Sequence, residues 1–210
     1  MIIPLEKIIS DYGMKIQGVI HIGGHRGQEI EKYKETGIQN GIFFEPQKLP
    51  FMECYVKSKQ AGYETYNLAL GNKSCRIDMN TAVPQLGMSS SILSPAKHLE
   101  QYPDIPFEGT EEVQMTTLDS FLNEGNINLD DYNFINIDVQ GYELEVFKGA
   151  KKTLERIDYV YSEVNRDEVY ENCAMVEDLD LFLSDYNLVR VLTDWGGETW
   201  GDALYVKNKK

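Results

Sequence analysis

The 210-residue chain has few cysteines, few cationic residues and no long apolar run. Cys54, Cys75 and Cys173 are odd in number and far apart, and no C-x-x-C pair is present, so neither a zinc ribbon nor a disulfide framework is indicated. No run approaches the roughly 18 apolar residues of a membrane-spanning helix. Residues 1–10 include Glu6 and Lys7 and lack the apolar core of a signal peptide. We therefore expect a protein of the reducing cytoplasm.

Positive charge is scarce as well. The 20 lysines and arginines stand against 34 aspartates and glutamates, which gives a formal net charge of -14. A surface this acidic repels nucleic acids and anionic membranes. We therefore expect neither as a partner, and we expect a small-molecule or carbohydrate substrate instead. The length predicts one domain over residues 1–210, large enough to bury a core without disulfides or metals.

Apolar runs of strand length alternate with helical patterns along most of the chain. The helices are predicted at 4–12, 28–36, 49–60, 141–154 and 176–183. This alternation predicts a parallel sheet with right-handed crossovers. The last two strands have no helix between them and should form an antiparallel hairpin. The fold class is thus α/β, a Rossmann-like three-layer sandwich with a mostly parallel seven-stranded sheet. Its strands are predicted at 17–22, 41–44, 64–68, 133–139, 159–162, 188–192 and 203–206.

The stretch 73–112 interrupts this alternation of strand and helix patterns. It contains a serine-rich run at 87–91 that is followed by three prolines, and only residues 76–79 resemble a strand. Long irregular segments inside compact domains are usually functional or disordered, so we expect a variable lid or substrate loop here. After it, residues 112–116 alternate like an edge strand. Asp119 is predicted to cap the N-terminus of a short helix that ends near Asn123.

A glycine loop follows the first strand. The apolar run ends in His21, and Gly23, Gly24 and Gly27 come directly before the next helical pattern. Glycines at such a turn let a ligand approach the main chain, and free N–H groups at a helix start attract polar or anionic groups. A bare tight turn is the simpler alternative. The spacing does not match the G-x-G-x-x-G pattern of dinucleotide-binding proteins.

Glu45 ends the second predicted strand, about 20 residues after the loop. In open parallel sheets, ligands bind beyond the carboxyl ends of the strands. A carboxylate at this position can accept hydrogen bonds from both ribose hydroxyls of a nucleotide. The loop and Glu45 together predict an adenosine-type ligand, although Glu45 could also be an exposed turn residue before Pro46. The later strand ends present further polar or small residues at the same edge: Asn67, Ala69, Asp138, Gln140, Glu163 and Asn165.

Asp138 and Glu163 are predicted at neighbouring strand ends, and Asp202 could join them. Paired carboxylates beside a hydroxyl substrate can act as a general base or can hold a divalent cation. We expect Asp138 to border both ligands and Glu163 to be the base, unless Glu163 only caps its strand or pairs with Arg166. We expect no metal site at the loop histidines, because they lack helical i,i+4 spacing and no H-E-x-x-H motif is present.

Several blocks of the sequence resemble those of FkbM-type methyltransferases. The loop sequence is closer to the D-x-G-x-x-x-G loop of class I methyltransferases than to a dinucleotide fingerprint. The matching blocks occur in the family's order at 21–27, 43–46, 67–71, 88–92, 116–121, 137–143, 147–150 and 162–163. The resemblance implies an enzyme that uses S-adenosylmethionine and mostly O-methylates sugars, polyketides and similar hydroxyl compounds by in-line methyl transfer.

The resemblance also implies the site residues. The catalytic candidates are Asp138 and Glu163. In place of the family's usual residues, His21 replaces an Asp, His25 an Asn and Gln140 a Glu. The missing acid commonly helps to hold the amino group of the cofactor, and His21 cannot supply its charge. The candidate cofactor-binding residues are His21, Gly23, Gly24, His25, Arg26, Gly27, Glu45, Asn67, Ala69, Ser90 and Asp138.

Two other functions are compatible with these patterns. One is an NAD(P)-dependent oxidoreductase, which the glycine spacing disfavours. The other is a non-catalytic cofactor-binding protein of the same fold, which the replacement at His21 favours. Trp195 and Trp200 could stack on a sugar or another ring substrate, or could simply pack over the predicted hairpin. His98 lies in the variable segment and could face the substrate.

Overall fold

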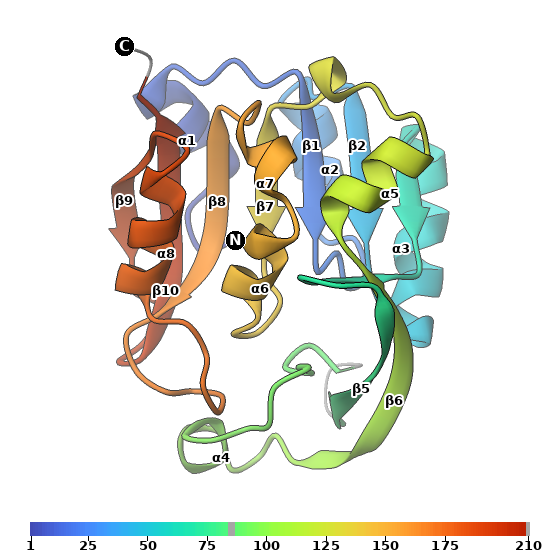
Figure 1. The fold of residues 1–210 in the computed structure, drawn as a ribbon, viewed down its shortest axis with the longest axis vertical. Coiled ribbons are helices and arrows are strands. Elements are labelled where there is room, and N and C mark those ends of the chain that lie inside the picture. The colour runs from blue at the N-terminus through green and yellow to red at the C-terminus, as the bar shows by residue number, and fades with distance from the viewer. Residues whose placement is uncertain (84–86, 209–210) are drawn as a thin grey trace.

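The computed structural model describes residues 1–83 and 87–208, and its main feature is a seven-stranded sheet (Figure 1). The strand order is β3-β2-β1-β7-β8-β10-β9. The first five strands run parallel, and β10 is antiparallel to both β8 and β9. This confirms the predicted α/β fold with an antiparallel C-terminal pair. The strands are β1 (Gly18–Ile22), β2 (Asn40–Phe44), β3 (Glu64–Tyr66), β7 (Phe134–Ile137), β8 (Tyr159–Asn165), β9 (Leu188–Asp194) and β10 (Trp200–Lys207).

Helices cover both faces of this sheet. One apolar cluster joins the sheet to α1, α2 and α3, and another joins it to α5, α6, α7 and α8. Alternate residues of β1 divide between the clusters, since Val19 packs in the first and Ile20 in the second. The result is a three-layer sandwich. The helices on the two faces are α1 (Leu5–Tyr12), α2 (Ile30–Glu35), α3 (Lys48–Ala61), α5 (Leu118–Glu124), α6 (Glu143–Lys148), α7 (Lys151–Leu154) and α8 (Val176–Ser184), and a 3₁₀ turn, η2, spans Leu129–Asp131.

Two helix predictions need correction. The single helix predicted over 141–154 is divided into α6 and α7 at Gly149, where a Cβ atom would lie 2.0 Å from the carbonyl oxygen of Gly71. The N-cap of α5 is Thr117, whose side chain accepts a hydrogen bond from the Ser120 N–H. The predicted cap, Asp119, instead accepts hydrogen bonds from the backbone N–H groups of Lys152 and Thr153 at the start of α7.

The stretch 73–112 is less irregular than predicted. The strands predicted at 76–79 and 112–116 are confirmed but are longer: β5 (Cys75–Ala82) and β6 (Phe107–Thr116) form a second sheet with β4 (Ala69–Leu70), in the order β4-β6-β5. The short helix α4 (His98–Gln101) lies in the connection, and the sheet extends beyond the carboxyl ends of the main strands (Figure 1). The first part of β6 is largely exposed and polar and pairs with β5, whereas Val113 and Met115 near its end pack in an apolar cluster with Ala69 and Met79. The third strand, predicted to reach residue 68, ends at Tyr66 because β4 belongs to the second sheet.

Within residues 1–83 and 87–208, none of the helices combines the length and the apolar character needed to cross a membrane.

Candidate functional site

A cavity of about 270 Å³ lies at the carboxyl ends of β1, β2 and β7 and reaches the second sheet. Most of the predicted cofactor-binding residues border it: His21, Gly23, His25, Glu45, Ala69, Ser90 and Asp138. Four others do not, namely Gly24, Arg26, Gly27 and Asn67. The cavity therefore lies where ligands bind in open parallel sheets, beyond the carboxyl ends of the strands.

The glycine loop shapes the cavity wall, but its own N–H groups are already hydrogen-bonded within the protein. Every backbone N–H from residue 23 to 27 already has a partner inside the protein. Gly23 and Gly24 donate to the Phe44 carbonyl oxygen, His25 to Glu45, Arg26 to the Gln28 side chain and Gly27 to the Gly24 carbonyl oxygen. The loop is thus tied to β2, and a ligand would meet its surface rather than its N–H groups.

Gly23 is required for a close approach between two strand ends. Its φ of +84° favours glycine, and a Cβ atom here would lie 1.8 Å from the carbonyl oxygen of Asp138. Gly24 and Gly27 face the core, where added Cβ atoms would meet Phe43 and Ile30. This explains why the first glycine borders the cavity and the other two do not.

Glu45 is only 4% exposed and lies at the cavity wall. Its Oε2 accepts a hydrogen bond from the His25 N–H at 2.7 Å, and its Oε1 accepts one from the Gln47 N–H at 2.8 Å. Burial raises the pKa of this carboxyl to about 7. A carboxylate has about four lone-pair sites, so Glu45 can still accept hydrogen bonds from ribose hydroxyls.

Asn67 and Arg26 act outside the cavity. The Asn67 side-chain amide donates to the carbonyl oxygens of Glu45 and Pro46, at 2.9 and 2.7 Å, and so holds the turn that carries Glu45. The Arg26 guanidinium donates to Glu53 at 2.7 Å and is largely exposed. Asn67 therefore has a positioning role in this structure, and Arg26 contacts α3.

His21 is buried at the end of β1. Its ring stacks on Phe43 at a centroid distance of 4.9 Å, and its Nδ1 lies 2.9 Å from the Tyr33 hydroxyl. Burial lowers the pKa of the imidazole, which favours the neutral ring. Sequence reasoning placed His21 at the site but did not find Tyr33, which comes from α2 on a neighbouring crossover.

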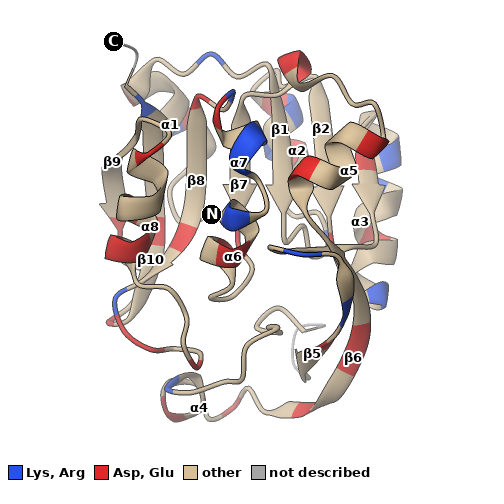
Figure 2. Ribbon diagram, in the orientation of Figure 1, with Lys and Arg blue, Asp and Glu red and all other residues tan. Residues whose placement is uncertain are grey.

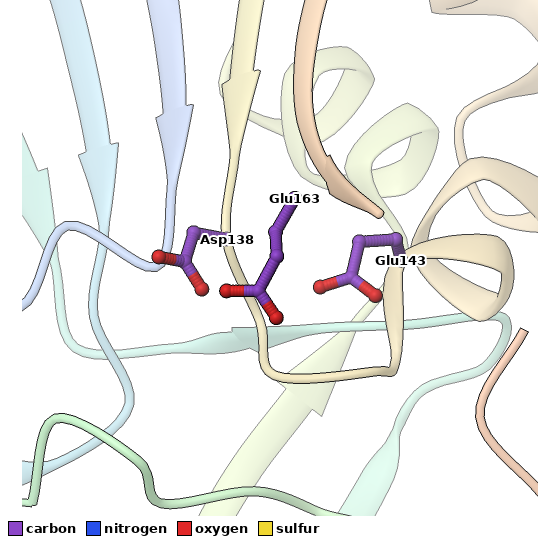
Figure 3. A group of neighbouring side chains, drawn as sticks. All are labelled: Asp138, Glu143 and Glu163. Atoms are coloured by element: carbon purple, nitrogen blue, oxygen red, sulfur yellow. The ribbon is translucent and has the colours of Figure 1, made fainter. Parts of the chain in front are cut away.

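Three carboxylates gather beside the cavity (Figure 3). Asp138 directly follows β7, Glu143 begins α6 and Glu163 lies within β8, and one oxygen from each falls within 4.8 Å of the others. Glu143 was not predicted as a site residue, because an acid in the first turn of a helix is common on protein surfaces. Here it is buried, and its Oε1 accepts hydrogen bonds from the N–H groups of Val139 and Gly141.

Glu163 has an unfavourable environment for negative charge. Burial raises its pKa well above the ordinary value, and the charges of Asp138 and Glu143 raise it further. Burial likewise raises the pKa of Glu143. The cluster therefore retains a proton more readily than isolated carboxylates would.

Gln140 bridges two members of the cluster. Its amide nitrogen donates to Asp138 Oδ1 at 2.7 Å and to Glu163 Oε2 at 2.9 Å, while its Oε1 accepts a hydrogen bond from the Tyr170 hydroxyl at 2.6 Å. Its φ of +54° is unusual for a residue with a side chain. Carboxylate oxygens suit Mg²⁺ or Ca²⁺, but here an amide donates hydrogen bonds into the cluster instead.

The predicted surroundings of Glu163 are wrong in three details. Glu163 does not end its strand, because β8 continues to Asn165 and pairs there with β10. It does not pair with Arg166, whose guanidinium donates to the carbonyl oxygens of residues 197 and 198. Asp202 lies opposite Glu163 in the register, but its carboxylate binds the Tyr161 hydroxyl and the Ile2 N–H. Glu163 does not border the cavity itself and is linked to it through Gln140 and Asp138.

The serine run forms part of the cavity wall. Ser90 accepts a hydrogen bond from the Ala82 N–H, and Ser91 donates to the Gln140 carbonyl oxygen at 2.7 Å. The segment is therefore connected both to β5 and to the turn that carries the carboxylate cluster. Sequence patterns alone did not distinguish these serines from an ordinary loop.

The tryptophans and His98 are packing residues in this structure. The Arg166 guanidinium lies 4.5 Å from the centre of the Trp195 ring, and Trp200 Nε1 donates to the Tyr102 hydroxyl at 2.8 Å. His98 is buried among aromatic rings, including that of Tyr102. None of the three borders the cavity, so the packing alternative describes the tryptophans better than substrate stacking.

These residues fit an adenosine-containing cofactor. The glycine loop keeps the wall open where a Cβ atom could not be placed, and Glu45 offers acceptor capacity at the second strand end. His21 offers no negative charge on the first strand. The cavity also has an apolar lining that includes Phe44, Leu68 and Met79, which suits a flat base.

Comparison with known proteins gives a family and a fold. The model of the methyltransferase FkbM domain matches residues 21–189. The 2-O-methyltransferase NoeI of Sinorhizobium fredii (strain NBRC 101917 / NGR234) is 25% identical over 178 residues, which cover 81% of this chain and 72% of NoeI.

Solved structures show the same fold at low sequence identity. Magnesium protoporphyrin IX methyltransferase (ChlM) from Synechocystis PCC 6803, with bound SAM, has a TM-score of 0.54 at 9% identity, covering 97% of this chain and 76% of that one. TrmK of M. capricolum, in complex with S-adenosyl-homocysteine, has a TM-score of 0.51 at 11% identity, covering 91% and 62%. Because the family match spans most of the sequence, the chain belongs to the FkbM methyltransferase family and is an S-adenosylmethionine-dependent methyltransferase.

Proposed function

We propose that the protein methylates a hydroxyl group of a carbohydrate or a similar small metabolite. The observation that carries the proposal is the buried carboxylate cluster beside the cavity, because a hydroxyl nucleophile needs a group that removes its proton. The similarity to NoeI, a 2-O-methyltransferase by name, supports oxygen as the methylated atom. With the family established, the oxidoreductase alternative loses its basis.

We propose that two groups of residues in the cavity wall hold the cofactor. Glu45 accepts hydrogen bonds from the ribose hydroxyls, while Gly23 leaves room beside the main chain. Ala69 and Ser90 form the wall contributed by the second sheet and its connection. Asn67 acts through Glu45, because its amide holds the carbonyl groups of the turn.

The carboxylates are proposed to manage the proton of the acceptor. S-Adenosylmethionine supplies an electrophilic methyl group on a sulfonium. As the carbon–oxygen bond forms and the carbon–sulfur bond breaks, Asp138 orients the hydroxyl at the cavity edge. The hydroxyl proton passes to the cluster and is retained by Glu163, because burial and the neighbouring carboxylates raise the pKa of its carboxyl well above the ordinary value. Gln140 keeps the two carboxylates together.

The acceptor is proposed to be uncharged or cationic, and the protein to act in the cytoplasm on small molecules rather than on nucleic acid. Acidic residues occur on α5, α6, α8 and β6 alike (Figure 2), and the net charge of -14 repels polyanions. We assign acceptor recognition to the variable segment 73–112, treated as part of a single domain over 1–210, since this segment reaches over the cavity.

A two-step experiment tests the proposal. Calorimetry first compares S-adenosylmethionine, S-adenosylhomocysteine and NAD, and we expect binding of the two sulfur compounds only. A radiolabelled methyl donor is then incubated with a panel of uncharged sugars, amino sugars and polyols, each paired with its deoxy analogue. Label transfer to a hydroxyl compound and not to its deoxy partner supports the proposal. Binding of NAD alone, or transfer only to nitrogen or carbon acceptors, contradicts it.

A further inference from the structure

His21 has a defined tautomer in this structure. The Asn136 amide donates to the Tyr33 hydroxyl at 2.5 Å, and an amide nitrogen cannot accept a bond in return. The single hydroxyl proton of Tyr33 is then directed to His21 Nδ1, 2.9 Å away. In a neutral imidazole, an accepting Nδ1 leaves the proton on Nε2. The stacked Phe43 ring holds this orientation.

This tautomer limits what His21 can bind. The ring borders the cavity with an N–H donor and no negative charge. A donor can bind a carboxylate but cannot accept a hydrogen bond from an ammonium group. The amino-acid portion of the cofactor carries both groups, so the His21 ring can serve only its carboxylate. A negatively charged acceptor for the ammonium group must come from another residue.

Glu29 is an acceptor at the same part of the cavity. It borders the cavity beside His21, precedes α2 and has a side chain that is 18% exposed. Its negative charge raises the pKa of both His21 and Tyr33. Its Oε1 forms an ion pair with the N-terminal ammonium group of Met1 at 3.7 Å, a separation too long for a direct hydrogen bond. The Glu29 carboxylate therefore retains acceptor capacity toward the cavity.

We propose that Glu29 binds the ammonium group of the cofactor, while His21 donates its Nε2 proton to the cofactor carboxylate. The acid that the family resemblance expects on the first strand is thereby supplied from the start of the crossover helix. This inference rests on the proposed cofactor site and assigns the chemistry of one part of it. Asp138 is the competing acceptor, because it borders the same cavity.

Two ligands, one with the amino-acid portion and one without it, distinguish a failure of this inference from a failure of the whole cofactor site. S-Adenosylhomocysteine contains the amino-acid portion, and 5′-methylthioadenosine lacks it. We expect Glu29→Gln to lower the affinity for S-adenosylhomocysteine by about tenfold to a hundredfold, the range of one charge-assisted hydrogen bond. The affinity for 5′-methylthioadenosine should not change. Glu31→Gln, an exposed acid on the same helix, is the matched control and should change neither affinity.

A double variant tests whether the acid has been relocated. Combining Glu29→Gln with His21→Asp returns a carboxylate to the first strand and should restore most of the lost affinity for S-adenosylhomocysteine. Asp138→Asn should lower the affinity for S-adenosylhomocysteine less than Glu29→Gln does. Imidazole nitrogen NMR adds a readout independent of ligands: His21 should show a protonated Nε2 and an unprotonated Nδ1, and Tyr33→Phe should disturb this state.

The outcomes are distinguishable. If neither sulfur ligand binds the wild-type protein, the proposed cofactor site itself is wrong. If S-adenosylhomocysteine and 5′-methylthioadenosine both bind, and Glu29→Gln lowers the two affinities equally or not at all, Glu29 does not hold the ammonium group. A larger loss in Asp138→Asn than in Glu29→Gln assigns that role to Asp138 and overturns the inference. A protonated Nδ1 on His21 overturns the assignment of the carboxylate.

Discussion

Glu45 and Glu163 are both buried carboxylates beside one cavity, yet their surroundings differ. Glu45 is 4% exposed, and each of its oxygens accepts a backbone N–H. Glu163 is 7% exposed, and its recorded partner is the amide of Gln140. Burial raises the pKa of both carboxyls, to about 7 for Glu45 and well above the ordinary value for Glu163.

This difference in surroundings suits Glu45 to binding a ligand and Glu163 to accepting a proton. Backbone donors stabilise the charge of Glu45 and hold its position, which suits a group that must accept hydrogen bonds repeatedly. Glu163 faces the charges of Asp138 and Glu143, so accepting a proton relieves repulsion as well as desolvation. Burial alone therefore does not define the role of a carboxylate, and the type of its donors and neighbours does.

The largest expected effect is on turnover when Glu163 is neutralised. Glu163→Gln keeps an oxygen that can accept the Gln140 hydrogen bond but cannot take a proton. We expect methyl transfer to fall by about 10²- to 10⁴-fold, the usual contribution of a general base, with unchanged affinity for S-adenosylhomocysteine. Glu124→Gln, on the exposed end of α5, is the control. Normal turnover in Glu163→Gln would refute the assignment.

Stability should depend on pH in the direction set by these raised pKa values. The folded state holds the Glu45 proton up to a pKa of about 7, whereas the unfolded chain releases it near 4.5. The folded state thus binds more protons between these values, and the free energy of unfolding falls as pH rises. For Glu45 the loss reaches about 3 kcal/mol above pH 7, and Glu163 and Glu143 act in the same direction.

Urea unfolding at pH 5 and pH 8 measures this dependence. Glu163→Gln should reduce the difference between the two values, since it removes one contributing group. Glu124→Gln should leave the difference unchanged. A wild-type protein that becomes more stable between pH 5 and pH 8 would show that these carboxyls are ionised at low pH in the folded state, contrary to the comparison above.

A smaller effect is expected when Glu45 is changed. Glu45→Gln replaces one acceptor oxygen with an amide that cannot accept from a ribose hydroxyl. We expect affinity to fall by about tenfold, and equally for S-adenosylhomocysteine and 5′-methylthioadenosine, because both contain the ribose. Calorimetry on both ligands measures this. A loss confined to S-adenosylhomocysteine would instead place Glu45 at the amino-acid portion of the cofactor.

The smallest effect is expected from metal removal. The Gln140 amide donates hydrogen bonds to Asp138 and Glu163, where a cation would otherwise relieve their repulsion. Turnover in EDTA should therefore match turnover in Mg²⁺. Gln140→Glu adds a fourth carboxylate and removes those donors, so added Mg²⁺ should raise its melting temperature and leave that of the wild-type protein unchanged. Loss of wild-type turnover in EDTA would assign the cluster to a metal.

The main sheet was predictable because its strands are continuous apolar runs between helical patterns. A strand such as β7 is buried on both faces and contains few polar residues, so its sequence alone indicates its position. The second sheet was predictable only in part. Strands were predicted at 76–79 and 112–116, but the rest of β5 and β6 was not predicted, because much of β6 is exposed and polar and becomes a strand by pairing with β5 and β4. Local patterns indicate which residues are buried, whereas strand pairing depends on distant partners.

The site residues likewise fall into those that the sequence predicted and those that only the tertiary structure revealed. Sequence alone determined the glycine loop, Glu45 at the second strand end and Asp138 at the end of β7, because topology brings the carboxyl ends of parallel strands together. Only the tertiary structure decided that Glu143 turns inward and that Gln140 bridges two carboxylates. It also decided that Glu29 lies beside His21. Hydrogen-bond partners and electrostatic neighbours come from different elements, so no local sequence pattern could have specified them.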